Sequence, residues 1–432
     1  MAEAVKAIQQ KLGKQDPYIL GIYITLIVFS VVESFSASSR EVTLATGFFT
    51  PMAKQLLFLA LGIGAMVICS KMNYAKFVTF GIGFSVITVG FMLYAAFFGK
   101  NINGAQRAVH LGILTVQPAE LAKVAIVFLL SLVMATNMDR KANRIKDKGM
   151  WTSVGIVGLF GFILAMQGMT NALLFGLVSL SMIVIGNINW KKFGIAALSI
   201  GFILLCIYAF SNHAEEKALP DLEQQQTEQT AGNTPTAPRS GTWGARLDRY
   251  FERFRTPLYT QPITEKNDQE MYSYMAQAHG GVVGVMPGNS RECSRLPLAF
   301  SDYVFSIIVE ETGLAGGLFL IGLFFTLLIR AGNIARKCNR AYPAFLVMGM
   351  AVMVVLQAYF HMAINTGVFP VSGQPLPMIS KGGTSVLVTS IAFGVMLSVS
   401  RTATQTNVAR DVRREEERLP ESMRAANPTR NE

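Results

Sequence analysis

The chain has 432 residues, of which 51% are hydrophobic and 15% are charged, whereas soluble domains usually carry about 25% charged residues. Runs such as 153–166 and 193–210 contain no charged residue, which excludes an ordinary soluble enzyme. The four cysteines lie in different segments, which excludes a disulfide framework and a Cys-x-x-Cys metal site. The net charge of +11 comes mostly from Lys and Arg beside the apolar segments, so it indicates a membrane protein and no nucleic-acid partner.

Ten apolar segments approach the roughly 20 residues that a helix needs to cross a bilayer core. They are 18–37, 54–70, 77–98, 119–136, 151–168, 172–188, 193–211, 303–329, 344–361 and 383–400. The first follows a polar stretch and lacks a small-residue cleavage site, so it is predicted to be a retained helix and not a signal peptide. The sequence therefore predicts an all-α polytopic membrane protein with about ten transmembrane helices, seven in 18–211 and three in 303–400.

The distribution of positive charge predicts that both termini are cytoplasmic. Lys and Arg concentrate in the N-terminal segment 1–17, in every second connection and in the tail 401–432, and positive residues are retained on the cytoplasmic side. The long connection 212–302, between helices 7 and 8, is then extracytoplasmic. Its part 215–240 is rich in Gln, Glu, Thr, Ala and Pro and is expected to be flexible. Aromatic, Arg and Gly residues from Trp243 onward predict ordered structure.

Several ionisable residues lie in or beside the apolar segments, where an unpaired charge is costly and therefore indicates function. Glu120 and Lys123 are three residues apart on one helix face, so they form either a self-satisfied ion pair or part of a site. Glu310 and Glu311 fit structural caps or pairs as well as they fit a site. Glu33 fits a position near the outer interface.

Asp302 lies where the long loop meets the apolar helix 303–329. Its carboxylate could cap the start of that helix, since Asp favours the capping position. It could equally be a base at the boundary between water and membrane, because partial desolvation makes a carboxylate a stronger proton acceptor. The residues alone leave both alternatives open.

Glycine and proline are dense in 279–290 and in 367–385, and in the second stretch this predicts a tightly folded or re-entrant loop between spans. Four arginines at short spacings form either a phosphate-binding strip or a solvated face paired with nearby acids. They are Arg246, Arg249, Arg253 and Arg255. The four histidines show no metal-binding spacing, so no metal site is predicted.

Four groups of motifs follow one another along the chain. They are Asn-Gly-Ala-Gln-Arg at 103–107, Gln-Pro-Ala-Glu at 117–120 with Lys123, Ser-Asp-Tyr-Val-Phe at 301–305 with Glu-Glu-Thr-Gly at 310–313, and Pro-Val-Ser-Gly-Gln-Pro-Leu-Pro at 370–377 with Ser-Lys-Gly-Gly-Thr-Ser at 380–385. In order, spacing and predicted topology, the chain from Ser36 to Arg401 resembles the SEDS family (shape, elongation, division and sporulation), the FtsW and RodA peptidoglycan polymerases.

The resemblance implies that the protein polymerises lipid II, an undecaprenyl-pyrophosphate disaccharide-pentapeptide, into glycan strands outside the bacterial cytoplasmic (inner) membrane. The family's catalytic aspartate falls on Asp302, which would accept the proton of the attacking 4-hydroxyl as undecaprenyl pyrophosphate leaves with inversion. The candidates for binding substrate or pyrophosphate are Arg107, Glu120, Lys123, Arg246, Arg249, Asn289, Ser380, Gly382 and Gly383. The resemblance requires no cofactor, although a divalent cation, Mg²⁺ or Mn²⁺, is an alternative to basic side chains for stabilising the leaving group.

Three features resemble the division-type FtsW branch more than the elongation-type RodA branch. They are Trp243 with Arg246, the stretch 287–290, and the stretch 398–401. This similarity implies a role in septal cell-wall synthesis. The resemblance to the family as a whole implies a class B penicillin-binding protein transpeptidase as a partner, and the division role implies other divisome proteins.

Some residues depart from the family pattern. Ala108 stands where Trp is usual, Leu298 where Glu or Gln is common, and Lys381 where an aromatic or apolar residue is frequent. The segment 167–171 lacks the Pro-Asp or Pro-Glu pattern often found between the fifth and sixth spans. These departures imply an altered rate or a greater dependence on the partner.

Two functions of other classes compete with polymerisation. A transporter that flips a polyprenyl-linked lipid would also need buried charges and a groove of lipid size, and it predicts translocation that survives the loss of Asp302. A scaffold that only recruits division enzymes predicts normal division after Asp302→Ala.

Overall fold

The computed structural model describes most of the chain. The described residues are 15–40, 49–98, 100–102, 105–111, 114–139, 144–186, 194, 198, 201, 250–253, 255–256, 260–264, 267–296 and 299–418. The helices are α2 (Pro17–Arg40), α3 (Phe49–Lys71), α4 (Lys76–Phe98), α5 (Pro118–Thr136), α6 (Asp147–Gln167), α7 (Met169–Ile185), α10 (Asp268–Gly280), the 3-10 helix η2 (Glu292–Ser294), α11 (Val304–Lys337), α12 (Ala341–Asn365) and α13 (Gly383–Arg418).

Eight helices of the described chain are long and apolar enough to cross a membrane, and a ninth apolar helix, Thr170–Ile185, is shorter. They coincide with nine of the ten predicted spans, so the prediction of an all-α polytopic membrane protein is confirmed. The tenth predicted span, 193–211, falls almost entirely outside the described residues. The stretch 215–240, which was predicted to be flexible, lies wholly outside them.

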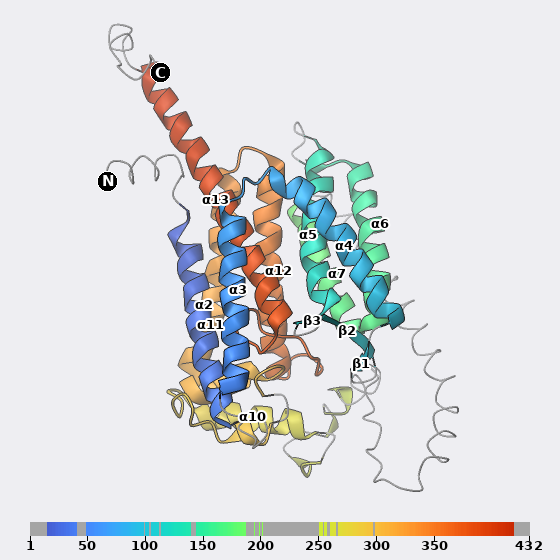
Figure 1. Cartoon of the computed structure of the whole chain (residues 1–432), viewed down its shortest axis with the longest axis vertical. Helices are drawn as coiled ribbons and strands as arrows, with labels where there is room; N and C mark the ends of the chain where they lie inside the picture. Colours follow the sequence, from blue (N-terminus) through green and yellow to red (C-terminus); the bar gives the residue numbers. More distant parts are fainter. Residues whose placement is uncertain are drawn as a thin grey trace.

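The membrane helices run side by side in one bundle, and α10 lies across one end of it (Figure 1). At the opposite end, Arg330 of α11 pairs with Asp16, just before α2, at 2.5 Å. The backbone N–H of Asp16 donates to Ser400 of α13, and Arg401 donates to the carbonyl of Met72 at 3.2 Å. The beginning of the first described span and the end of the last membrane segment therefore lie on the same side of the bundle.

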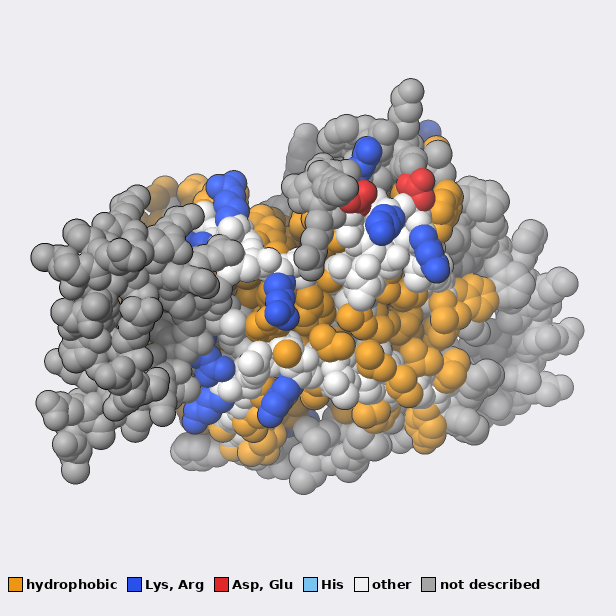
Figure 2. Space-filling model, turned by 90° about the horizontal axis from the view of Figure 1, so that it is seen from above, with side chains coloured by type: hydrophobic (Ala, Val, Ile, Leu, Met, Phe, Trp, Pro, Cys, Tyr) orange, Lys and Arg blue, Asp and Glu red, His pale blue; other side chains and the backbone are white. Residues whose placement is uncertain are grey.

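Positive charge marks the end of the bundle from which α13 projects. Viewed from above, this face shows Lys and Arg side chains more often than Asp and Glu among its described residues (Figure 2). Positive residues collect on the cytoplasmic side of membrane proteins. The distribution agrees with the predicted cytoplasmic termini, and the orientation of the bundle stays a prediction.

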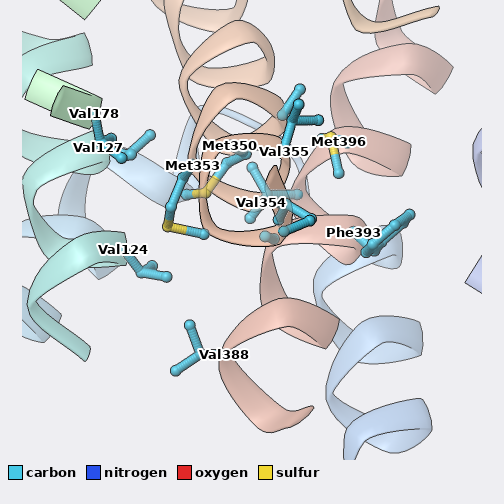
Figure 3. Packing of buried hydrophobic residues seen from close by; sticks show 14 of the residues in the cluster. Val124, Val127, Val178, Met350, Met353, Val354, Val355, Val388, Phe393 and Met396 are labelled. Carbon is cyan, nitrogen blue, oxygen red and sulfur yellow. The ribbon is translucent and has the colours of Figure 1, made fainter. Parts of the chain in front are cut away.

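Helix α12 lies in the interior of the bundle, where apolar side chains of four helices meet. Met353 of α12 lies near Val127 of α5, while Phe393 and Met396 of α13 lie on the other side of α12 (Figure 3). Most of α12 and of the segment Gly383–Ala403 of α13 is buried, whereas most of the apolar spans in α3 and α4 is not. The interior helices α12 and α13 therefore provide a firmly packed frame for the segment that joins them.

A small antiparallel sheet precedes α5 and was not predicted. Its strands are β1 (Lys100–Ile102), β2 (Ala105–Leu111) and β3 (Leu114–Val116), paired in that order, and a separate two-stranded ladder joins β4 (Met138–Asp139) to β5 (Arg144–Ile145). The sequences between the first three strands are Asn103-Gly104 and Gly112-Ile113, which favour two-residue hairpin turns. A search for apolar helical runs alone misses this signal. The sheet leads into Gln117 and so sets where α5 begins.

Helix α11 is interrupted at Gly313, whose φ of 75° is in the left-handed region. In an unbroken helix the Leu314 N–H would bond to the Glu310 carbonyl. Here Leu314 donates to the Gly281 carbonyl at 2.9 Å, and the Glu310 carbonyl accepts from Val285 at 3.0 Å. The loop that follows α10 therefore satisfies the backbone groups that the break exposes, and this loop is fastened to the helix that follows Asp302.

Candidate functional site

A cavity of about 370 Å³ lies where α3, the start of α5, the segment before α11 and the segment between α12 and α13 meet. Its lining residues are Lys54, Gln55, Phe58, Gln117, Ser301, Asp302, Gly373, Pro375, Lys381, Gly382, Gly383, Thr384 and Ser385. Among these described residues, Asp302 provides the only carboxylate and the two lysines provide the positive charge. The volume falls in the range of roughly 300–1,000 Å³ that is typical of small-molecule sites.

Asp302 is half-buried, two residues before α11. Ser301 donates from Oγ to Oδ1 of Asp302 at 2.9 Å. Tyr303, and not Asp302, occupies the N-cap position of α11, and no side chain caps the helix there. The geometry therefore does not support the capping alternative and leaves the carboxylate as part of the cavity wall.

Asn365, at the end of α12, holds the backbone of Asp302. It is fully buried, and its Nδ2 donates to the Asp302 carbonyl at 3.0 Å and to the His361 carbonyl at 2.9 Å. Its Oδ1 accepts from the backbone N–H and the hydroxyl of Ser306, at 3.2 and 3.0 Å. Asn365 thus joins the start of α11 to the end of α12. The sequence reasoning missed it, although an Asn next to an apolar span is a visible signal.

His361 holds the other side of the cavity. Its Nδ1 lies 2.6 Å from the Gln374 carbonyl. Because a carbonyl can only accept, Nδ1 carries the proton of this buried imidazole. The neighbouring residue, Gly373, faces the carboxylate: a Cβ added there would lie 3.0 Å from Oδ2 of Asp302. Helix α12 therefore positions both Asp302 and the loop that packs against it.

Glu120 and Lys123 lie behind the cavity wall. Both side chains are 2% exposed, and Lys123 Nζ lies 2.6 Å from Glu120 Oε1 and 2.8 Å from Gln357 Oε1. Gln357 donates in turn to Glu120 at 3.3 Å and to the Pro375 carbonyl at 3.1 Å. Neither charged residue lines the cavity, whereas Pro375 does. The described geometry therefore favours the ion-pair alternative, in which the pair supports the wall through Gln357.

Three residues predicted to bind substrate or pyrophosphate, Ser380, Gly382 and Gly383, lie at the cavity. Gly382 and Gly383 line it where α13 begins. Ser380 fastens the wall, since its hydroxyl donates to the Ser301 carbonyl and accepts from the Leu376 N–H, both at 2.7 Å. Lys381 also lines the cavity, so one of the departures from the family pattern falls directly within the candidate site.

Other predicted residues lie elsewhere or outside the described structure. Asn289 is exposed, donates to the Val285 carbonyl at 3.1 Å and does not line the cavity. Arg107 lies in β2, but its side chain is outside the described part, and Arg246 and Arg249 are outside it entirely. In the described part, no group of three or more His, Cys, Asp or Glu side chains could hold a metal ion.

Arg253 is a described member of the predicted arginine strip, and aromatic residues hold it. Its guanidinium lies 4.3 Å from the centre of the Tyr250 ring and donates to the Tyr274 hydroxyl at 2.9 Å. Burial raises the pKa of the Tyr274 phenol, which keeps the hydroxyl neutral as an acceptor. Arg253 thus has a structural role in packing the segment before α10.

The acidic residues of α11 fasten the loop before it. Glu310 is fully buried and accepts from Ser290 Oγ and from the backbone N–H of Arg291, at 2.5 and 2.9 Å. Glu311 accepts from the Gly288 N–H at 3.0 Å. These contacts match the alternative in which Glu310 and Glu311 are structural caps or pairs and not part of a site. Glu33 is also buried, at 3% exposure.

The segment 167–171, which departs from the family pattern, contacts the loop that faces Asp302. Asn171 accepts through Oδ1 from the side-chain amide of Gln374 at 2.5 Å. Ala108 lies in β2 with its side chain outside the described part, and Leu298 is outside the described residues. The amide contact gives the unusual segment a part in holding the loop that faces Asp302.

Known proteins of one family resemble this chain over most of its length. The family model of the FtsW/RodA/SpoVE cell cycle proteins matches residues 17–405. A relative named probable peptidoglycan glycosyltransferase FtsW, from Geobacter sulfurreducens, is 26% identical over 408 residues, covering 90% of this chain and 96% of its own. Peptidoglycan glycosyltransferase MrdB of Escherichia coli (strain K12) is 23% identical over 389 residues, covering 89% of this chain and 93% of its own.

Two solved structures share the fold. The rod shape determining protein RodA of Thermus thermophilus matches with a TM-score of 0.58 and 17% identity, over 90% of this chain and 97% of RodA. A chain of a peptidoglycan synthase complex, described as coordinating polymerization and crosslinking, matches with a TM-score of 0.62 and 21% identity, over 90% of this chain and 98% of that chain. Since the family model covers nearly the whole bundle, this chain belongs to the FtsW/RodA/SpoVE family of cell cycle proteins.

Proposed function

We propose that this chain is a peptidoglycan glycosyltransferase that polymerises lipid II into glycan strands during septal cell-wall synthesis. The observation that carries the proposal is the position of Asp302, the only carboxylate among the described residues that line a cavity with two lysines. Membership of the family and the names of the glycosyltransferase relatives support the same activity.

In the proposed reaction Asp302 is the general base. The 4-hydroxyl of the acceptor sugar attacks C1 of the donor sugar, and its proton passes to the Asp302 carboxylate. The bond between C1 and the diphosphate oxygen breaks, its electron pair leaves with undecaprenyl diphosphate, and the configuration at C1 inverts. A positioned base of this kind contributes about 10²–10⁴-fold to a rate. Ser301, Asn365 and Gly373 would hold the carboxylate in place.

The proposal includes a location and a partner. We propose that the bundle lies in the bacterial cytoplasmic membrane with the Asp302 end outside, and the Lys and Arg side chains on the opposite end support this orientation. A class B penicillin-binding protein transpeptidase is the proposed partner, supported by the fold shared with a chain of a peptidoglycan synthase complex. Other divisome proteins would recruit the pair to the septum.

The test is polymerisation of fluorescently labelled lipid II by the purified full-length protein, with and without its class B transpeptidase, followed by gel separation. We expect glycan ladders from the wild type and from Asp147→Asn, which changes an exposed carboxylate outside the cavity. Asp302→Ala and Asp302→Asn should give none. Ladders that persist in both Asp302 variants would remove the general-base role.

The same preparations separate polymerisation from the competing functions. A transporter would be favoured by two results together: the protein translocates lipid II in vesicles even after Asp302→Ala, and the wild type gives no ladders. Normal septation in cells whose only copy is Asp302→Ala would favour a scaffold. We expect neither result.

A further inference from the structure

We propose that the start of α13, residues 381–385, is a cradle for a phosphate group of a lipid-linked diphosphate. Lys381, Ser385 and the backbone amides of the first helical turn would hold the charge of the leaving group. This inference rests on the proposed function and gives the leaving group a place opposite the base.

The first turn of α13 faces the cavity. Its first helical hydrogen bond runs from the Val386 N–H to the Gly382 carbonyl at 3.1 Å. The amides before Val386 therefore have no carbonyl partner within the helix, as at every helix start. The helix dipole adds partial positive charge there, and α13 has no acidic residue in its first turn. The start of the helix is thus suited to an anion.

Ser385 provides an independent observation. It lines the cavity, its side chain is 3% exposed, and its Oγ has no hydrogen-bond partner among the described residues. The neighbouring Thr384, by contrast, accepts through Oγ1 from the Gln117 N–H at 3.3 Å. A buried hydroxyl without a partner is unfavourable, and a rotation about χ1 that turns Oγ toward the cavity would let a phosphate oxygen accept its proton.

Gly382 also lines the cavity beside Ser385, and it has no side chain to cover the backbone there. Its φ lies outside the left-handed region. Among the described residues, a Cβ added to it would meet only the Cβ of Ser385, at an ordinary 3.8 Å. The adjacent Gly383 differs, since a Cβ there would come within 2.4 Å of the Phe58 ring. Neither backbone conformation nor protein packing explains the glycine at 382, whereas close approach of a ligand to the backbone does.

Two lysines complete the cradle. Lys381 and Lys54, from the start of α3, line the cavity that also contains Asp302. The Lys381 N–H donates to the Phe300 carbonyl at 2.9 Å, which ties the cradle to the segment that carries the base. Ammonium groups bind phosphate as point charges. The cavity thus has a carboxylate from the segment before α11 and positive charge from α3 and the start of α13.

The test is binding of farnesyl diphosphate to the purified full-length protein in detergent, measured by calorimetry. We expect Ser385→Ala, Gly382→Ala and Lys381→Gln each to raise the Kd at least about tenfold, the effect of losing one charge-assisted contact. Three matched variants should leave the Kd unchanged. Ser131→Ala also removes a buried hydroxyl without a described partner, and Gly64→Ala adds a Cβ that meets no described atom within 4 Å. Lys76→Gln removes a lysine that does not line the cavity. An unchanged Kd in all three cradle variants would overturn the proposal.

Further ligands identify what the cradle binds. Farnesyl monophosphate should bind at least about tenfold more weakly than the diphosphate, because it carries less negative charge for Lys54 and Lys381 to hold. Inorganic pyrophosphate should also bind more weakly than farnesyl diphosphate. Equal affinity for inorganic pyrophosphate would overturn the assignment to a lipid-linked ligand.

Stability and catalysis distinguish this inference from the proposed function. Ser385→Ala removes a hydroxyl without a described partner, so its thermal midpoint should equal or exceed that of the wild type, and a lower midpoint would count against the cradle. Asp302→Asn should bind farnesyl diphosphate at least as tightly as the wild type while losing polymerisation. If the wild type polymerises lipid II and the cradle variants bind farnesyl diphosphate normally, only the cradle is overturned. If the cradle variants bind farnesyl diphosphate weakly but the wild type does not polymerise lipid II, only the proposed function is overturned.

Discussion

Gly373 lies against Asp302 so closely that a methyl group on it would be 3.0 Å from Oδ2 and 3.6 Å from Cγ of the carboxylate. The glycine belongs to the segment between α12 and α13, which His361 and Gln357 hold from α12 through the carbonyls of Gln374 and Pro375. The position of the carboxylate in the cavity therefore depends on a loop more than 70 residues further along the chain.

Gly373→Ala tests this contact. The added methyl group should displace the carboxylate, and a small displacement of a catalytic group lowers kcat by about tenfold to a hundredfold. KM for lipid II and the thermal midpoint should change little, because the loop keeps its other contacts. Initial rates of polymerisation measure the effect. Gly322→Ala is the control, since a Cβ there meets nothing within 4 Å in the described part of the chain. Wild-type kcat in Gly373→Ala would show that this approach does not position the base.

Asn365→Ala should destabilise the fold and lower the activity. The substitution removes the amide that bonds to Asp302, His361 and Ser306, and it leaves these buried groups without that partner. We expect a loss of roughly 2–4 kcal/mol in the free energy of unfolding. Thermal unfolding in detergent should show this as a lower midpoint. Asn289→Ala, which loses one exposed hydrogen bond, should change the midpoint little, and equal midpoints for the two variants would contradict the role of Asn365.

Glu120 and Lys123 should behave as a coupled pair. Removing one partner leaves the other charge buried, which costs about 3–5 kcal/mol, so Lys123→Met alone should be strongly destabilised. The double variant Glu120→Gln with Lys123→Met should be less destabilised than that single variant. Unfolding midpoints of the complete double-mutant cycle measure the coupling. Arg295→Gln removes an exposed partner of Glu292 and should cost less than about 1 kcal/mol. Additive effects of the two buried substitutions would argue against a coupled pair.

Gly313→Ala should prevent stable folding of the end of the bundle that carries Asp302. Its φ of 75° disfavours any side chain, and a Cβ would lie 2.2 Å from the Val282 carbonyl oxygen. The left-handed conformation alone costs about 1–3 kcal/mol, and the contact with the backbone adds to it. We expect a sharp fall in the thermal midpoint or in the yield of folded protein. Gly322→Ala on the same helix should leave both unchanged, and a Gly313→Ala variant as stable as this control would contradict the account of the break.

Much of the architecture was predictable because it depends on local properties. An apolar run of about 20 residues forms a membrane helix almost independently of its neighbours, so nine predicted spans match helices of the described chain. The sheet before α5 was missed because its strands are short, although Asn103-Gly104 indicates a tight hairpin. The break in α11 has a local signal in Gly313, but the loop that completes its hydrogen bonds comes from another part of the sequence.

In the site as well, local sequence predicted some residues and contacts between distant segments decided the others. Asp302, Gly382 and Gly383 were candidates by motif, and all three line the cavity. Glu120 and Lys123 were candidates for substrate binding, with a self-satisfied ion pair as the alternative. They lie behind the wall, because the rotation of α5 and the contact with Gln357 on α12 decide where their side chains point. Lys54 and Ser385 had not been candidates at all.

The sequence by itself therefore determined the number and order of most spans, the segregation of charge along the chain and the carboxylate at the membrane boundary. Each of these follows from the cost of placing a given side chain in lipid, which is a property of the residue and its close neighbours. Only the tertiary structure decided which side chains face one cavity, which charges neutralise each other and which loop presses on Asp302. Those outcomes depend on contacts between helices distant in sequence, where a rotation of one helix exchanges the residues that meet.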